Sequence, residues 1–518
     1  MEHGVPALWR NIHNLKRLEI RTFHLTWMSF FVCVVAWMGL MPINGVIQEE
    51  LSLTDSQMSS VIIATVVLAI FARPFAGWCC DMFGPRKTYA WTLFIGAIPV
   101  IFSGFAWNFE TLIVSRALVG CIGGSFVISI YHATLMFGPN IVGQANGLVT
   151  GWGAFGVASS FLVLPAAVTG FFASELLGMS DWRLLMVMTG VVMVFFGVLY
   201  LKGTKDTPIG NFEDLRQDDF VPQKSEVNPC WRMAVADHRT WIMSAIYGTC
   251  VGLEIAVASF GGLYFIEEFG LSLVQAGWII GAFGFMNLIG RGFGGFLADH
   301  RGSSVGLRGR SKILFACLLL EGGTLMLFSQ AATLLPAIIL FLLFSLFTQM
   351  SEGATYAITP FMKQGSMGAV NGIVAGGGTL GALLAGVTLV GIPSWSEAYF
   401  GLGFVAALGS VLVFFMRFSP EEENAERKAI ALSSFEFVKQ KIEKLRANRL
   451  HWNRMKLRHQ GAIWRLIDIK CKSLQNQIDR LEDILEEGEA HHHEASSPPQ
   501  RRVTPVPLRI VWDATKGN

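Results

Sequence analysis

Charged residues are scarce in most of this 518-residue chain. Asp, Glu, Lys and Arg make up 15% of the sequence, whereas hydrophobic residues make up 52%. A typical soluble domain carries about 25% charge. The charge is also uneven, because residues 421–518 hold 33 of the 78 charged residues. This composition excludes a disordered chain or an ordinary soluble enzyme as the main body. It indicates an apolar membrane body followed by a polar tail.

The usual signatures of chemistry are also missing. The eight cysteines lie mostly inside apolar runs, with neither metal-like nor disulfide-like spacing, so we expect reduced, packed thiols. We find no phosphate loop, metal constellation or nucleophile–base set. The sequence therefore predicts no enzyme activity, no cofactor, no metal site and no nucleic-acid partner.

Apolar runs long enough to cross a bilayer occur twelve times, because a helix needs about 20 such residues. They lie near 23–47, 56–80, 88–107, 111–136, 143–170, 183–201, 240–266, 273–298, 312–331, 333–357, 368–391 and 395–416. We predict an all-α membrane protein with twelve transmembrane helices in two six-helix repeats, plus a helical tail. The expected divisions are an N-terminal segment (1–22), a first half (23–201), a linker (202–239), a second half (240–417), an amphipathic tail (418–487) and a disordered C-terminus (488–518).

Lys and Arg gather in one set of loops, which predicts the orientation. Acidic residues prevail in the opposite set, with Arg183 as the main basic exception. We therefore expect a multi-pass protein of the cell (inner or plasma) membrane with the linker and both termini in the cytoplasm. The basic set includes Arg86, Lys87, Lys202, Arg301 and Lys363.

The two halves repeat one another. Arg73-x-x-x-Gly77-x-x-x-Asp81 recurs as Arg291-x-x-x-Gly295-x-x-x-Asp299. In the fifth and eleventh runs, six residues recur at identical spacing, first as Gly143, Asn146, Gly147, Gly151, Gly153 and Gly156, then as Gly368, Asn371, Gly372, Gly376, Gly378 and Gly381. Two six-helix halves of matching orientation resemble the major facilitator superfamily, whose substrate site lies near the midplane between the halves.

The short loops after the second and eighth runs resemble the cytoplasmic signature of that superfamily. They contain Asp81 with Arg86, and Asp299 with Arg301. The resemblance implies that these charges latch the halves together; the alternative is a plain turn with solvated charges. Gly-x-x-x-Gly spacing lets helices approach closely. We expect Gly151, Gly156, Gly376 and Gly381 to pack helices, either statically or while the halves rock.

Two arginines lie where a membrane helix should be apolar. Arg73 and Arg291 each precede a loop aspartate by eight residues, about 12 Å along a helix. A buried arginine costs about 2.5–3.5 kcal/mol, so an anion must meet each one. Because planar guanidinium groups suit an oxyanion, we predict that the pair binds a small one. The alternative is that each arginine pairs with an acid on another span, such as Glu254 or Glu352.

Several stretches resemble the nitrate/nitrite porter family across about residues 20–417. They are Phe23–Phe31, Gly151–Gly156, Asp206–Phe212, His238–Trp241 and Gln349–Tyr356. The resemblance implies that Arg73 and Arg291 hold nitrate or nitrite, that Phe126 packs on its plane and that Tyr247 donates to it. It also places Gly153, Gly378 and Thr379 at the site. Ala154 and Thr379 stand where the family commonly has Asn, which affects affinity and the preference between the two anions.

Uptake of a monoanion into a negative cytoplasm needs co-transported cations or exchange for another anion, because each charge costs about 2.3 kcal/mol per 100 mV. Glu254 and, secondarily, Glu352 are the candidate proton-coupling residues, since arginine does not deprotonate. The alternative for Glu254 is a fixed salt bridge. We thus expect nitrate uptake with protons, with nitrate/nitrite antiport or a transporter-like anion sensor as alternatives.

The tail carries a short coiled-coil seam downstream of a basic stretch. A basic stretch near a membrane anchor can lie on anionic lipid, so expected partners include membrane lipid and, through the tail, an oligomer or a cytoplasmic protein. A solvated helix without a partner is the alternative. The seam consists of Ile467, Cys471, Leu474, Ile478, Leu481 and Leu485.

Overall fold

The computed structural model describes residues 12–166, 180–208, 210–217, 221–362, 366–392 and 394–427, with a few single positions beyond. Every regular element in these ranges is helical. The predicted coiled-coil seam lies outside the described residues except for Cys471, and Lys363 and residues 488–518 lie outside them too.

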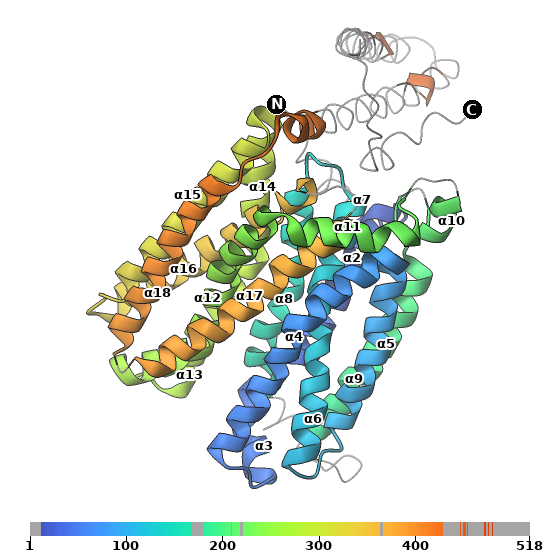
Figure 1. Cartoon of the computed structure of the whole chain (residues 1–518). Helices are drawn as coiled ribbons and strands as arrows, with labels where there is room; N and C mark the ends of the chain where they lie inside the picture. Colours follow the sequence, from blue (N-terminus) through green and yellow to red (C-terminus); the bar gives the residue numbers. More distant parts are fainter. Residues whose placement is uncertain are drawn as a thin grey trace, which may run out of the picture.

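Two helical bundles make up the body, and Figure 1 colours them from blue to cyan-green and from green to orange. The first contains α2 (Leu18–Met38), α3 (Asn44–Glu50), α4 (Asp55–Phe83), α5 (Pro85–Ser103), α6 (Phe109–Gly120), α7 (Ser125–Met136), α8 (Val142–Ala166) and α9 (Asp181–Gly203). The second contains α12 (His238–Phe269), α13 (Leu273–Phe285), α14 (Asn287–Val305), α15 (Leu307–Phe328), α16 (Leu334–Thr355), α17 (Met367–Gly391) and α18 (Trp395–Val411). The linker forms α10 (Phe212–Gln217) and α11 (Lys224–Ala236).

These helices occupy all twelve predicted positions. Ten helical segments of the described chain are long and apolar enough to cross a membrane. The shorter pairs α6–α7 and α13–α14 each make one of these segments. Helices α5 and α8 fill the two remaining positions. The all-helical membrane fold predicted from hydropathy is therefore confirmed.

Local signals determine where helices begin and end. Helix α4 begins after Thr54, whose side chain accepts from the Gln57 N–H while the Gln57 side chain caps Thr54 in return. It ends at Gly84, where φ is +85°. Pro85 then starts α5, a position at which its missing N–H costs nothing. A second glycine with positive φ, Gly306 at +81°, makes the corresponding turn between α14 and α15.

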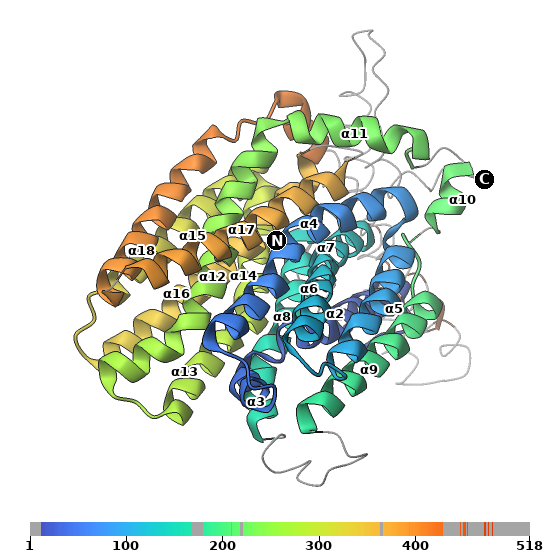
Figure 2. The same cartoon turned by 60° about the horizontal axis from the view of Figure 1, so that its bottom comes forward.

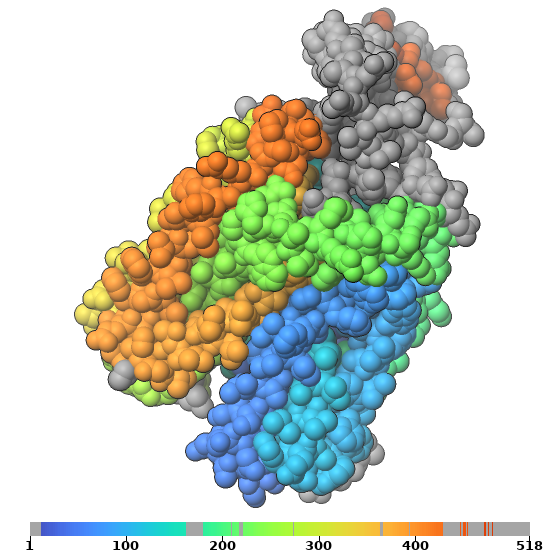
Figure 3. Space-filling model, viewed as in Figure 1, coloured from blue at the N-terminus to red at the C-terminus, as the bar shows by residue number. Residues whose placement is uncertain are grey.

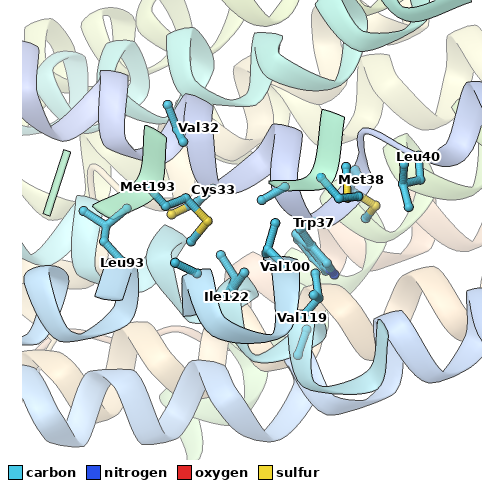
Figure 4. Packing of buried hydrophobic residues seen from close by; sticks show 14 of the residues in the cluster. Val32, Cys33, Trp37, Met38, Leu40, Leu93, Val100, Val119, Ile122 and Met193 are labelled. Carbon is cyan, nitrogen blue, oxygen red and sulfur yellow. The ribbon is translucent and has the colours of Figure 1, made fainter. Parts of the chain in front are cut away.

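Each bundle has its own apolar core. In the first, Cys33 and Trp37 of α2 pack with Ile122 and with Leu93 of α5 (Figure 4). In the second, rings dominate: Phe283 and Phe341 lie 4.7 Å apart between centroids. The large apolar residues of the outer helix surfaces are exposed instead, as expected for contact with lipid; they include Phe71, Phe75, Ile95, Val191, Trp278 and Val390.

The two bundles meet at the end of the molecule where α11 lies (Figure 2). There α4 packs on α17 and α8 packs on α14. Gly77 and Gly368 bring the backbones of α4 and α17 together, and Gly143 and Gly295 do the same for α8 and α14. Figure 3 shows the bundles in contact near α11 and separated toward the opposite end. The closed end therefore depends on backbone-to-backbone contact between the halves.

We expect Gly77→Ala to lower the Tm, because the new Cβ has no room beside the Gly368 carbonyl and overpacking costs about 1–3 kcal/mol. Gly277→Ala is the matched control, since a Cβ there meets nothing within 4 Å. Thermal unfolding of the two purified variants checks this, and an unchanged Tm for Gly77→Ala would argue against tight closure at α11.

Candidate functional site

A cavity of about 120 Å³ lies between the two bundles. Its walls come from α2, α4, α7 and α8 on one side and from α12, α13 and α14 on the other. The lining is mostly apolar. Its charged residues in the described chain are Arg73, Glu254 and Arg291. A small apolar cavity with a few converging charges is the usual form of a small-molecule site.

Arg73 enters this cavity from α4 and is 3% exposed. Its Nη1 donates to the Ala375 carbonyl of α17, on the opposite half. Its guanidinium carbon lies 5.3 Å from the Phe126 ring centroid and 5.8 Å from that of Trp37. Within the described residues, no carboxylate pairs with Arg73 and its Nε has no hydrogen-bond partner. A buried cation is thus left with unused donor capacity.

Arg291 is held quite differently. Its Nη2 lies 2.9 Å from Glu254 Oε2 and 2.8 Å from Glu352 Oε2. Its Nε donates to Gln349 Oε1 at 2.6 Å. Of the two possibilities that the sequence left open, pairing with an acid on another span is therefore the one observed for Arg291. The cause is helix geometry, because α12, α14 and α16 turn these groups toward one point.

The two carboxylates have unequal surroundings. Glu254 Oε1 accepts from Gln349 Nε2 at 2.6 Å and from Asn287 Nδ2 at 3.1 Å. Glu352 is 1% exposed and accepts from the Tyr247 hydroxyl at 3.3 Å, while its Oε1 has no partner among the described residues. The two carboxylates therefore share one nitrogen of Arg291, and their mutual repulsion is offset by the nearby positive charges of Arg291 and Arg73.

The remaining predicted substrate residues divide into two groups. Phe126 lines the cavity. Tyr247, Gly153, Gly378 and Thr379 do not: the Tyr247 hydroxyl is directed to Glu352. A Cβ at Gly153 would collide with the Phe30 ring, and one at Gly378 would collide with the Tyr247 ring. These two glycines therefore let aromatic rings pack closely and do not line the cavity. The Thr379 hydroxyl is buried and has no partner in the described structure.

Sequence reasoning missed four residues of the site. Trp37 lies over Arg73, and Tyr356 packs edge-on against Phe126 at 5.4 Å. Gln349 and Asn287 hold Glu254. Gln349 precedes Glu352 by three residues, a spacing that places both on one face of a helix. The sequence therefore contained a signal for Gln349, but it contained none for the direction of the Trp37 side chain.

The four glycines expected to pack helices all lie against another helix. Their partners are Asn287 of α14 for Gly151, Phe31 and Val34 of α2 for Gly156, Ile70 of α4 for Gly376, and Gly248 of α12 for Gly381.

Comparison with known proteins agrees with this architecture. The family model described as Major Facilitator Superfamily matches residues 26–359. The High affinity nitrate transporter 2.7 of Arabidopsis thaliana is 31% identical over 376 residues, which cover 70% of this chain and 76% of that protein. The chain belongs to the nitrate/nitrite porter family of the Major Facilitator Superfamily. It is a multi-pass membrane protein.

Other relatives of this porter span most of its length. The Nitrate/nitrite transporter NrtP of Nostoc punctiforme is 26% identical, covering 80% of this chain and 96% of that protein. The structure of the proton:xylose symporter XylE aligns with a TM-score of 0.58 and 14% identity, covering 77% of this chain and 96% of that one. At this identity, the structural likeness supports the fold alone.

The closed end of the porter holds the predicted latch residues. Asp81 Oδ1 accepts from the Gly368 N–H at 3.1 Å, at the start of α17. Asp299 accepts from the Gly143 and Gln144 N–H groups at 3.1 and 2.8 Å, at the start of α8. Each aspartate thus caps a helix of the opposite half, where unpaired N–H groups favour negative charge.

Among the described residues, neither aspartate forms an ion pair with the predicted latch bases Arg86 and Arg301. Arg86 donates to the Leu201 carbonyl of its own half, and Arg301 is exposed. Arg310 of α15 is the base that pairs with Asp299. Arg301 follows Asp299 by two residues within α14, a spacing that places two side chains on different faces of a helix, and Arg86 lies beyond the Gly84 turn, in α5.

Arg310 also joins the latch to the beginning of the tail. Residues 420–427 form a helical turn, and Glu426 within it lies 2.7 Å from Arg310 Nε. Both side chains are completely buried. Arg310 Nη2 reaches across to the Pro139 carbonyl of the first half at 2.7 Å. Burial raises the pKa of Glu426, and the Arg310 guanidinium opposes that rise. The carboxylate therefore depends on Arg310 to keep its charge.

We expect Glu426→Gln to loosen the closed end, because Arg310 loses one of its two carboxylates and a charged hydrogen bond contributes about 1.5–3 kcal/mol. Hydrogen exchange at the Gly143 and Gln144 amides should then quicken roughly tenfold or more. Glu423→Gln is the control, since its partner Arg308 is 74% exposed. Equal exchange in both variants would contradict a role of the tail in closure.

Proposed function

We propose that the chain transports nitrate across the cell membrane by alternating access, with the anion held between Arg73 and Arg291. The relatives named as nitrate transporters support this substrate. The observation that carries the proposal is Arg73 itself, a buried guanidinium beside a cavity with no carboxylate paired to it in the described chain. A bound nitrate would supply the anionic partner that Arg73 lacks.

The shape of the site suits a flat oxyanion. A guanidinium forms parallel hydrogen bonds in its own plane, and the Nε of Arg73, which has no partner among the described residues, is free to donate one of them. Phe126 and Trp37 bound the cation from two sides, which limits the room beside it. We infer that Phe126 also contacts the plane of the anion. Nitrite, which shares the charge and the flat shape, is the expected second substrate.

Arg291 couples anion binding to proton binding, because it contacts two carboxylates. With both carboxylates ionised, Glu254 and Glu352 neutralise Arg291 and Arg73 in sum, so an entering anion would make the cluster negative. A proton on either carboxylate restores neutrality and loosens Arg291 from one partner. One nitrate then enters with one proton and no net charge. This removes the electrical cost of about 2.3 kcal/mol per 100 mV that an anion alone would face.

The closed end and the cavity correspond to one state of an alternating-access cycle. We place α11 and the latch at the cytoplasmic side, because Lys87, Lys202, Lys224 and Arg308 lie around that end. The cavity then faces the outside. Opening toward the cytoplasm requires that Asp81 and Asp299 leave the N-termini of α17 and α8. The glycine contacts between α4 and α17 and between α8 and α14 must separate at the same time.

We expect Arg73→Lys and Arg291→Lys each to lower nitrate uptake into reconstituted vesicles by about 30-fold or more. Lysine keeps the charge but loses the planar fork, and charged hydrogen bonds contribute about 1.5–3 kcal/mol each. The control is Arg308→Lys, an exposed site outside the cavity. Wild-type uptake by both cavity variants would reject the proposed site.

Glu254→Gln and Glu352→Gln test the coupling. Each should make nitrate uptake insensitive to an inward proton gradient, because glutamine keeps the shape but cannot take up a proton. Glu397→Gln is the control, because Glu397 of α18 belongs to the same half but is exposed and lies outside the cavity. Uptake is measured with the pH gradient and the internal counter-anion varied independently. If all three variants keep the pH dependence, or if uptake requires internal nitrite, proton symport is wrong.

A further inference from the structure

A second cavity of about 680 Å³ lies between the N-terminal end of α2 and the C-terminal end of α9, remote from the charge cluster. Its lining residues include the cations Arg21 and Lys202 and the apolar side chains Leu25, Met28 and Leu199, which we call its floor. No acidic residue is among its described lining residues. The groove thus combines two cations with an apolar floor.

The helical spacing places the cations at one end of the apolar side chains. On α2, Arg21, Leu25 and Met28 follow one another at i, i+4 and i+7, which places them on one face. On α9, which runs in the opposite direction, Phe195, Leu199 and Lys202 do the same. Each helix therefore presents an apolar stripe that ends in a cation, and both cations lie at the same end of the bundle.

The cationic end is structurally anchored. Arg21 Nε donates to the Gly203 carbonyl at 2.7 Å, which holds the guanidinium at the end of α9 beside Lys202. His24 bonds to the Ile12 carbonyl at 2.7 Å and so brings the segment before α2 over one wall. The apolar stripe continues along exposed side chains, because Val191 is 56% and Phe195 58% exposed. The groove is thus continuous with the membrane-facing surface of α9.

We propose that this groove binds one anionic phospholipid, with the phosphate at Arg21 and Lys202 and an acyl chain along Leu25, Met28 and Leu199. Basic pockets between membrane helices are suited to anionic headgroups. A soluble phosphate would use the cations but leave the apolar floor exposed, and a neutral lipid would use the floor but not the two cations. The chemistry of the groove needs both parts in one molecule. The site is independent of the proposed transport of nitrate.

Native mass spectrometry of the purified full chain, titrated with phosphatidylglycerol or phosphatidylcholine, tests this site. We expect tight retention of one phosphatidylglycerol by the wild type. Each cation near an anionic headgroup contributes roughly fivefold, so Lys202→Gln should weaken retention about fivefold and Arg21→Gln with Lys202→Gln about 30-fold. Leu199→Asn should also weaken it, without any change in charge.

Arg232→Gln with Lys312→Gln is the control, because both residues are exposed, both lie outside the groove and the pair removes the same charge. It should retain the lipid as the wild type does. Equal retention of phosphatidylcholine, unchanged binding in the groove variants, or displacement of the lipid by millimolar inorganic phosphate would each overturn the proposal.

Discussion

The pairing of Arg291 with two buried carboxylates is the interaction on which the rest of the site depends. In a medium of low dielectric constant, a cluster of four charged groups has a strong preference for overall neutrality. Both carboxylates of the cluster, Glu254 and Glu352, contact Arg291, while Arg73 has only a carbonyl and two rings beside it. The site is thus asymmetric although the two arginines occupy equivalent positions in the repeat. Arg73 has no carboxylate partner in the described chain and is available to an anion. Arg291 connects that anion to the charges of Glu254 and Glu352.

The same sequence repeat also supplies the contacts that hold the two halves together at the closed end. Glycine pairs let helices of opposite halves meet at their backbones, and an aspartate of each half caps a helix of the other. These contacts are short-ranged and lie at the same end of the molecule, so separation of the halves at that end would break them together. The second half carries an additional layer, in which Arg310 ties Asp299 to Glu426. A segment beyond the last membrane helix is thereby built into the contact between the halves.

Much of this architecture follows from the sequence, but the partners of individual charges do not. Hydropathy and the repeated Arg-x-x-x-Gly-x-x-x-Asp pattern placed twelve helices and both deep arginines, because those signals depend only on position along a helix. The partner of Arg291 depends on how α12, α14 and α16 are rotated about their axes, so the choice between a vacant and a paired guanidinium stayed open. The exchange of Arg301 for Arg310 beside Asp299 has the same cause. Family resemblance named Tyr247 as a ligand, yet its hydroxyl reaches Glu352.

Proton uptake on anion binding tests the central claim most directly. Nitrate is added to the purified protein in weakly buffered solution near neutral pH, and the pH change is recorded together with the amount of nitrate bound. If the charge of the anion is balanced at Glu254 and Glu352, about one proton should enter for each nitrate bound. Stoichiometric binding of nitrate without any uptake of protons would contradict the account.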